Sequence, residues 1–145
     1  MQDSIYRILD VNFNRLREAL RVIEEFFRFI LEEEKSSVDL KKMRHLLTGM
    51  EKLIGHELLL KNRDTAGDCF AFNTRPEEMN RLEHSDVLNA NFKRAQEASR
   101  VIEEYSKLSG IDNVSQSAKE IRFSLYTLQK ITAPKLQQFS AKDIS

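Results

Sequence analysis

Glycine, proline and cysteine are all scarce in this sequence of 145 residues, which holds four glycines, two prolines and one cysteine. The single cysteine, Cys69, cannot form a disulfide within the chain, so a fold stapled by its own disulfides is excluded. No apolar run approaches the roughly 20 residues that cross a bilayer. The start of the chain also lacks a basic and then apolar leader. These features predict a reduced, cytoplasmic protein with no membrane partner.

An excess of one charge is also missing, because 23 lysines and arginines balance 23 aspartates and glutamates. Proteins that bind nucleic acid normally carry a surplus of positive charge, so nucleic acid is not expected as a partner. The length and the 41% of hydrophobic residues are enough to form one core without metals. A single domain is therefore expected over residues 1–134.

Apolar residues recur at spacings of three and four along most of the chain, which predicts an all-α protein. Four long helices are expected, over about residues 4–34, 36–60, 85–109 and 115–132. A Ser-x-x-Asp cap at Ser36 begins the second of these helices. Gly110 ends the third, and Pro134 stops the fourth.

The remaining segments are predicted to connect these helices or to follow them. Residues 61–73 show no clean periodicity and are expected to form a loop. Thr74-Arg75-Pro76-Glu77 is typical of a capping box with proline in the first turn, which predicts a short helix. Residues 135–145 are expected to form a loose tail.

Residues 12–25 and 91–104 are near copies, related by an offset of 79 positions, and ten of the fourteen aligned residues are identical. The second and fourth helices follow at an offset of 78. The chain is therefore predicted to be a duplicated helical hairpin, with repeats over about residues 5–60 and 84–132. Neither hairpin can cover its own apolar face. We expect the two to pack into a four-helix bundle-like domain with approximate two-fold pseudo-symmetry.

Both copies of the repeat place polar residues on the apolar side of their helix. They are Asn12, Arg15 and Glu18 in the first copy and Asn91, Arg94 and Glu97 in the second. Because each residue turns by about 100°, Arg15 falls within roughly 20° of Val22 and Phe26. We therefore expect Arg15 and Arg94 to be mostly buried, each bound to a carboxylate or to an anion.

Two interpretations of these polar sets are open. In one, they form ion pairs in the core that fix the register between the hairpins. In the other, they converge on a cleft and hold an anionic ligand through arginine forks. A solvated helix face is expected for four further residues, Arg21, Glu24, Arg100 and Glu103. Arg44, on the second helix, is expected to be half-buried.

The segment Arg63-Asp64-Thr65-Ala66-Gly67-Asp68 is the second concentration of reactive groups. Arg63 can bind phosphate, Thr65 and the backbone at Gly67 can donate hydrogen bonds, and Asp64 and Asp68 can hold Mg²⁺ or orient an arginine. A plain turn would use the same residue types. Glycine-rich phosphate loops are absent from the sequence, so any nucleotide must be held by side chains. Glu-x-x-His and Glu-x-x-Glu motifs are absent too, which disfavours a di-iron bundle and the all-α pyrophosphohydrolases.

With these motifs the sequence resembles a known family, the helical hydroxymethylpyrimidine phosphate kinase-like domain found N-terminal to some bacterial thiamine-phosphate synthases. The resemblance rests on residues 12–25, Arg44-His45, residues 63–68 and residues 91–100, and it covers about residues 5–132. The barrel-shaped synthase part that follows in fused members is missing. The chain is therefore expected to be a free-standing form or a fragment, without synthase activity of its own.

The resemblance implies transfer of the γ-phosphoryl group of ATP, with Mg²⁺, to hydroxymethylpyrimidine phosphate, giving the diphosphate used in thiamine synthesis. The acceptor is already largely dianionic, so the site needs charge neutralisation more than a general base. From residue chemistry, the expected catalytic residues are Arg63, Asp64, Asp68, Glu18 and Glu97. The expected substrate-binding residues are Asn12, Arg15, Arg44, Thr65, Gly67, Asn91 and Arg94. The sequence predicts no firm metal site.

Two other functions are left open. The chain could instead be a non-catalytic interaction or regulatory domain of a thiamine-phosphate synthase. It could also be a cofactor-free helical enzyme with an arginine-lined site of the chorismate-mutase kind. A thiamine-phosphate synthase and a second copy of the chain are the candidate protein partners. For the kinase, residues 63–68 are expected to fold against the N-terminal halves of the first and third long helices and to complete a phosphate site there.

Overall fold

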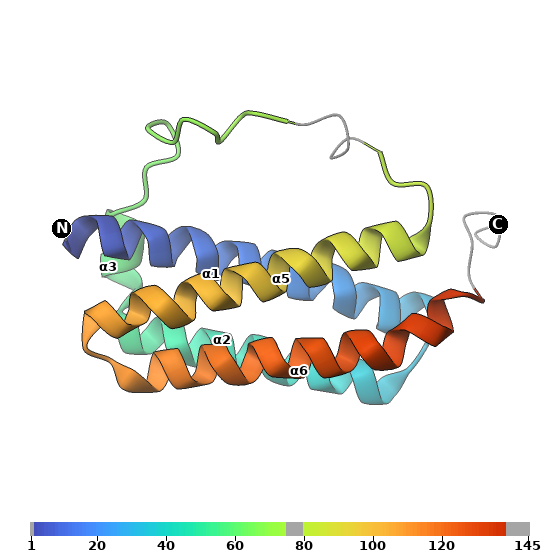
Figure 1. The fold of residues 1–145 in the computed structure, drawn as a ribbon. Coiled ribbons are helices and arrows are strands. Elements are labelled where there is room, and N and C mark those ends of the chain that lie inside the picture. The colour runs from blue at the N-terminus through green and yellow to red at the C-terminus, as the bar shows by residue number, and fades with distance from the viewer. Residues whose placement is uncertain (1, 75–79, 139–145) are drawn as a thin grey trace.

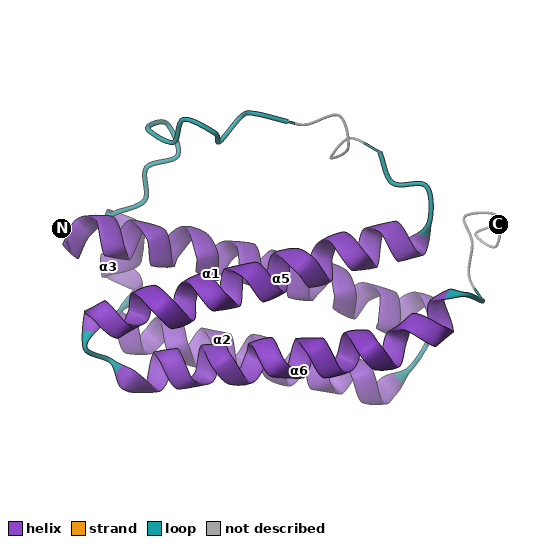
Figure 2. Ribbon diagram, in the orientation of Figure 1, coloured by secondary structure: helices purple, strands orange, loops and turns teal. Residues whose placement is uncertain are grey.

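The computed structural model describes residues 2–74 and 80–138, and every regular element in these ranges is helical (Figure 2). The elements are α1 (Gln2–Glu25), a π-helical turn (Phe26–Ile30), α2 (Glu34–Ile54), α3 (His56–Lys61), α5 (His84–Ser106), a 3₁₀ turn (Lys107–Ser109) and α6 (Asp112–Leu136). The predicted all-α class is confirmed. The predicted capping box and short helix after Thr74, and the tail beyond residue 138, lie outside the described residues.

The four long helices form a bundle in which each predicted hairpin, α1–α2 and α5–α6, contributes two neighbours (Figure 1). The most extensive contact is between α1 and α5, which run antiparallel, and α2 and α6 pack together on the other side. The chain between α3 and α5 leaves one end of the bundle and returns at the other, on the side of α1 and α5. The predicted four-helix bundle is therefore confirmed.

One buried apolar cluster runs through the bundle, with α1 supplying most of its large side chains: Leu9, Phe13, Leu16, Leu20, Ile23 and Phe27. The second copy of the repeat replaces Leu16 and Leu20 with Ala95 and Ser99, and both replacements are fully buried. The smaller side chains of α5 leave room for the larger ones of α1, with which α5 makes the most extensive contact of the bundle. None of the described helices is both long and apolar enough to cross a membrane.

The second predicted helix, over residues 36–60, is divided at Gly55 into α2 and α3. Gly55 has φ of 111°, in the region that side chains other than glycine's rarely adopt. The chain therefore turns between α2 and α3. The predicted Ser36 cap is also wrong, because α2 begins at Glu34 and the Ser36 hydroxyl is buried and donates to the Glu33 carboxylate.

The other long helices also differ from prediction at their ends. The first predicted helix changes to a π-helical turn after Glu25, whereas the third ends at Gly110 as predicted, in the left-handed conformation with φ of 77°. The fourth does not stop before Pro134, because α6 continues to Leu136. Proline lacks only one hydrogen bond in this last turn, and the buried side chain of Leu136 favours continuation of the helix.

Candidate functional site

The two copies of the repeat face each other across a cavity of about 430 Å³ between α1 and α5, which we call the interhelical groove. Each helix contributes five residues at equivalent positions: Asn12, Arg15, Glu18, Ala19 and Val22 from α1, and Asn91, Arg94, Glu97, Ala98 and Val101 from α5. The two alanines are buried, whereas the arginines and glutamates are exposed. The alanines therefore form the floor of the groove and the charged side chains its walls.

The expectation that Arg15 and Arg94 are buried is wrong, since both side chains are exposed. Their sector of the helix includes Val22, which is itself 37% exposed, so this sector is the rim of the interface and not its core. Among the described residues, no ion pair or hydrogen bond engages either guanidinium. The interpretation of these residues as core ion pairs is therefore wrong, and both cations remain available to a ligand.

The two asparagines of the groove are fixed by their own helices. The Asn12 amide donates to the Ile8 carbonyl at 2.9 Å, and the Asn91 amide donates to the Val87 carbonyl at 2.8 Å. In both residues the side-chain carbonyl accepts no hydrogen bond from the part of the chain that the structure describes. Each asparagine can therefore accept a hydrogen bond from a ligand amino group.

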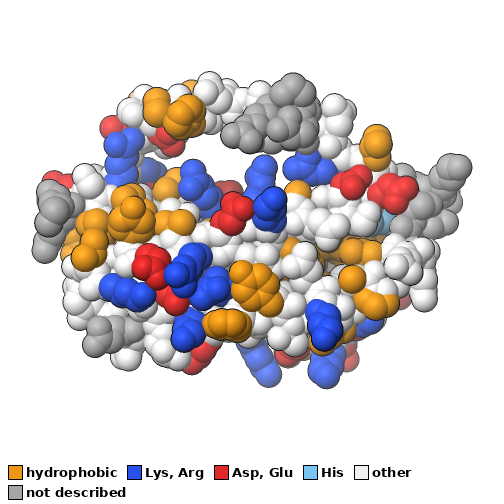
Figure 3. All heavy atoms as spheres, in the orientation of Figure 1, with side chains coloured by type: hydrophobic (Ala, Val, Ile, Leu, Met, Phe, Trp, Pro, Cys, Tyr) orange, Lys and Arg blue, Asp and Glu red, His pale blue; other side chains and the backbone are white. Residues whose placement is uncertain are grey.

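The segment from Arg63 to Asp68 folds onto the N-terminal half of α1 and encloses a second cavity of about 560 Å³, which we call the loop pocket. Its charged lining residues are Arg7, Asp10, Arg15, Arg63, Asp64 and Asp68, and Thr65 also lines it. Arg15 lines both cavities, so they meet at its side chain. Basic and acidic side chains gather over α1 and α5 beside the opening under the loop (Figure 3).

Only half of the predicted placement of this loop is confirmed. The loop does lie against the N-terminal half of α1, because α2 and α3 return the chain to that end of the bundle. It does not lie against the N-terminal half of α5. Since α5 runs antiparallel to α1, that half lies at the opposite end of the molecule.

Arg63 is held by a bidentate interaction with Asp10, in which Nε donates to Oδ2 at 2.8 Å and Nη2 donates to Oδ1 at 2.9 Å. Asp10 is only 5% exposed. Its hydrogen bonds raise the pKa of Arg63, which therefore stays a cation. Sequence reasoning missed Asp10 because its counterpart in the second repeat is Asn89. The sequence feature that could have identified Asp10 is its position directly after Leu9, a residue of the apolar stripe.

Further hydrogen bonds shape the loop. Arg7 donates to the backbone carbonyl of Asp64 at 3.0 Å, which fastens the loop to α1. The Gly67 N–H donates to Asp64 Oδ1 at 2.8 Å, and the Phe70 N–H donates to Asp68 Oδ1 at 2.9 Å. A Cβ atom at Gly67 would meet the Asp64 carboxylate, so a larger residue there would displace that side chain from its hydrogen bond. One oxygen of each aspartate remains for a ligand.

Within the described residues, no group of three carboxylate, histidine or cysteine side chains could hold a metal ion. The Mg²⁺ that accompanies a nucleotide is bound mainly by phosphates and water, with one or two carboxylates from the protein. Asp64 and Asp68 are carboxylates of this kind, and both line the loop pocket.

Arg44 is not brought into either cavity. Its guanidinium pairs with Glu24 at 2.9 Å, and the corresponding residue of the second repeat, Arg122, pairs with Glu103 at 3.0 Å. Glu24 is 5% exposed and Glu103 is 6% exposed, so the expected solvated face is wrong for the glutamates. The arginines three residues before them are exposed, as expected. These duplicated pairs join the two helices of each hairpin.

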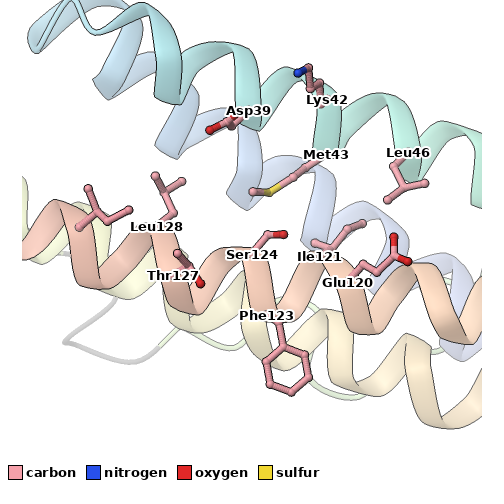
Figure 4. A pocket seen from close by; sticks show the side chains of 11 residues that line it. Asp39, Lys42, Met43, Leu46, Glu120, Ile121, Phe123, Ser124, Thr127 and Leu128 are labelled. Carbon is pink, nitrogen blue, oxygen red and sulfur yellow. The ribbon is translucent and has the colours of Figure 1, made fainter.

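A further hollow, of about 570 Å³, lies between α2 and α6, away from the loop (Figure 4). Its lining is largely apolar and includes Met43, Leu46, Ile121 and Leu128. None of the predicted site residues lines it. The polar residues of both repeats and of the loop are instead concentrated on the α1 and α5 side.

Comparison with known proteins places these features in a family. The model of the ThiD2 family matches residues 7–131. The thiamine-phosphate synthase of Nostoc punctiforme is 41% identical over 89% of this chain and 35% of its own length. That of Thermosynechococcus vestitus is 42% identical over 86% of this chain and 34% of its own length. The chain thus spans about a third of these relatives, and no solved structure matches it.

Proposed function

Because the chain belongs to the ThiD2 family, we propose that it acts in thiamine biosynthesis, as a phosphotransferase that converts hydroxymethylpyrimidine phosphate to its diphosphate with ATP. The relatives named thiamine-phosphate synthase support the pathway. The observation that carries the proposed chemistry is the meeting of the loop pocket and the interhelical groove at Arg15. Two phosphorylated molecules can approach each other there from the two cavities.

The arginines around this junction are suited to neutralise phosphate charge. Arg15 and Arg94 have no partner to release among the described residues, so binding a phosphate breaks no existing ion pair. Arg63 uses two of its five N–H donors on Asp10 and keeps the others for a ligand. Asp10 fixes the orientation of that guanidinium, so less conformational entropy is lost when a phosphate binds.

Phosphoryl transfer to an acceptor that is already anionic depends on positioning and charge stabilisation. In the proposed complex, Arg15 and Arg63 bind the reacting phosphates, while Asp64 and Asp68 contact the Mg²⁺ that the nucleotide brings. The side-chain carbonyl of Asn12 accepts a hydrogen bond from the exocyclic amino group of the pyrimidine, while that of Asn91, toward the Val22 end of the groove, is available to the second ligand. Glu18 and Glu97 line the groove beside its arginines and can contribute a carboxylate to the same Mg²⁺.

Incubation of the chain with ATP, Mg²⁺ and hydroxymethylpyrimidine phosphate tests this proposal through release of ADP that depends on the acceptor. Arg15→Gln and Arg94→Gln should each lower kcat/KM at least about tenfold, a loss of about 1.4 kcal/mol of transition-state stabilisation. Both side chains are exposed and unpaired within the described part, so the midpoint of unfolding should not change.

Arg100→Gln is the matched control, because it removes the same charge from α5 outside the groove, where the side chain is 55% exposed. It should leave turnover within about twofold. Absence of acceptor-dependent ADP release from the wild-type chain would contradict the phosphotransferase.

A second candidate function is a non-catalytic domain of a thiamine-phosphate synthase. It is supported by the relatives, in which the matching part is about a third of a longer synthase. If the chain binds hydroxymethylpyrimidine phosphate by calorimetry without releasing ADP, and changes the rate of a separately prepared synthase, this candidate replaces the kinase. A chain that leaves the synthase rate unchanged contradicts it.

A further inference from the structure

A third cavity of about 250 Å³, which we call the aromatic pocket, lies beside the interhelical groove at the end away from the loop pocket. Its lining includes Val22, Phe26, Phe29, Ile30, His84 and Leu88. Val22 lines both the groove and this pocket, as Arg15 lines both the groove and the loop pocket. The three cavities therefore follow one another along α1, each next to the previous one at a shared side chain.

The aromatic pocket is a place where the two repeats differ. Residues 26–30 form a π-helical turn, whereas the second repeat forms a 3₁₀ turn over Lys107–Ser109. The π-helical turn presents Phe29 and Ile30 with 61% and 42% of their surface exposed. Such turns are rare within helices and are frequent at functional sites. The groove thus has a charged end at the loop and an apolar, aromatic end at the π-helical turn.

Phe29 is the ring of this pocket that a flat ligand can reach, since 61% of its surface is exposed. The Phe26 ring is buried and packs on Phe27 and His84, so it forms part of the pocket wall. Heteroaromatic bases stack on such side chains irrespective of their hydrogen-bonding edges. The pocket is therefore suited to a planar heterocycle whose remaining groups extend along the groove.

The distance between the aromatic pocket and Arg15 determines which ligand can reach both. Eleven residues separate Arg15 from Phe26, which is about 16 Å along a helix that rises 1.5 Å per residue. In hydroxymethylpyrimidine phosphate, one methylene group and one oxygen join the ring to the phosphorus. In a nucleoside triphosphate, a ribose and two further phosphates separate the base from the terminal phosphate. Only the nucleotide is long enough to place its ring in the aromatic pocket and its terminal phosphate at Arg15.

We infer that the aromatic pocket binds the purine base of the nucleotide donor. This inference rests on the proposed function and adds the orientation of its donor. The triphosphate then follows the groove past Arg94, which lies toward the Val22 end because α5 runs antiparallel to α1, and reaches Arg15. The acceptor enters from the loop pocket.

A tryptophan reporter tests the inference, because the chain has no tryptophan of its own. In Phe29→Trp, the fluorescence of the new indole should be quenched by ATP and by adenosine, and should not change with hydroxymethylpyrimidine phosphate. The matched control is Phe123→Trp on α6. Phe123 is 51% exposed with the Arg122 guanidinium 4.9 Å from its ring centre, as Arg28 lies 4.8 Å from that of Phe29. The control should show no quenching.

The variant Phe29→Ala gives a second measurement. Its Kd for ATP should rise about tenfold, a small effect among those seen when an aromatic side chain that stacks on a base is replaced by alanine. Its Kd for hydroxymethylpyrimidine phosphate should stay within about twofold of the wild-type value. Equal quenching in the control, quenching by the pyrimidine phosphate alone, or no binding of ATP and adenosine would overturn the inference. Failure of the kinase itself is distinguishable, because ATP would then quench the reporter without acceptor-dependent release of ADP.

Discussion

The arginines of this chain divide into two kinds according to what surrounds them. Arg44, Arg63 and Arg122 each pair with a carboxylate that is at least nine-tenths buried. Arg15 and Arg94 lie on the rim of the α1–α5 interface and have no such partner within the described residues. The first kind stabilises the fold through these ion pairs. The second is available for binding, which is why substitutions of the two kinds should have different effects on stability.

Substitution of Arg63 should lower both activity and stability, since Asp10 would remain buried without its partner. We expect Arg63→Ala to cost about 1–2 kcal/mol of unfolding free energy, less than a fully buried pair because the Arg63 side chain is 44% exposed. Urea denaturation measures this loss. Adding Asp10→Asn should restore most of the stability and none of the activity. A double variant as unstable as Arg63→Ala would contradict this account.

The duplicated pairs Glu24–Arg44 and Glu103–Arg122 should also stabilise the protein. Glu103→Gln should cost about 1–3 kcal/mol, because Arg122 loses a charged partner at a site that is only 6% exposed. Its neighbour Glu104, 45% exposed at the side chain, serves as the control, and Glu104→Gln should leave the urea midpoint close to that of the wild type. If both variants unfold at the same urea concentration, the buried pair is not a stabilising element.

The centres of the helices could be predicted from the sequence and their ends could not. Periodicity reports which residues face the core, and the apolar stripe of α1 lies in the core as predicted. Where each helix ends depends on which of several hydrogen bonds and packing contacts is the most favourable there. The Ser36 hydroxyl donates to a side chain and does not cap α2, and burial of Leu136 outweighs the effect of Pro134. The capping or helix-breaking preference of a single residue does not include such hydrogen bonds and packing contacts, so it does not predict the exact end of a helix.

Gly49 and Gly55 both lie within the second predicted helix, and substitutions of the two glycines test where that helix is broken. Gly55 has φ of 111° between α2 and α3, so Gly55→Ala should cost about 1–3 kcal/mol. Gly49 lies inside α2, and a Cβ atom there would meet nothing within 4 Å. Gly49→Ala should therefore stabilise the protein by about 0.5–1 kcal/mol. Thermal unfolding compares the two variants, and a shift of the same sign in both would contradict the assigned break.

At the scale of the molecule, the repeat could be used to predict the interhelical groove, because equivalent residues of two antiparallel helices must meet near a pseudo-two-fold axis. The repeat could not be used to predict what differs between the ends of the groove. Asp10 meets Arg63 across 53 positions of sequence, and the π-helical turn has no copy in the second repeat. The candidate site thus combines a symmetric part that the sequence predicts with asymmetric parts that only tertiary structure brings together.

One ion pair connects the two hairpins across 102 positions, between Glu33 at the start of α2 and Lys135 at the end of α6. Hydrogen bonds from Lys135 and Ser36 hold the pKa of Glu33 below its usual value of 4.5. A carboxyl group with a lowered pKa in the folded state stabilises the protein above its unfolded-state pKa. That contribution is lost as the pH falls through the folded-state pKa.

Wild-type stability should therefore decrease more steeply below about pH 4.5 than that of Lys135→Ala, so the difference between their urea midpoints should shrink toward pH 3. The pair is partly exposed, so the difference at pH 7 should be no more than about 1 kcal/mol, and salt should reduce it. Lys130→Ala, an exposed lysine on the same helix, controls for loss of one positive charge and should follow the wild type. Parallel pH profiles for the wild type and Lys135→Ala would show that the ends of the two hairpins are held together by packing alone.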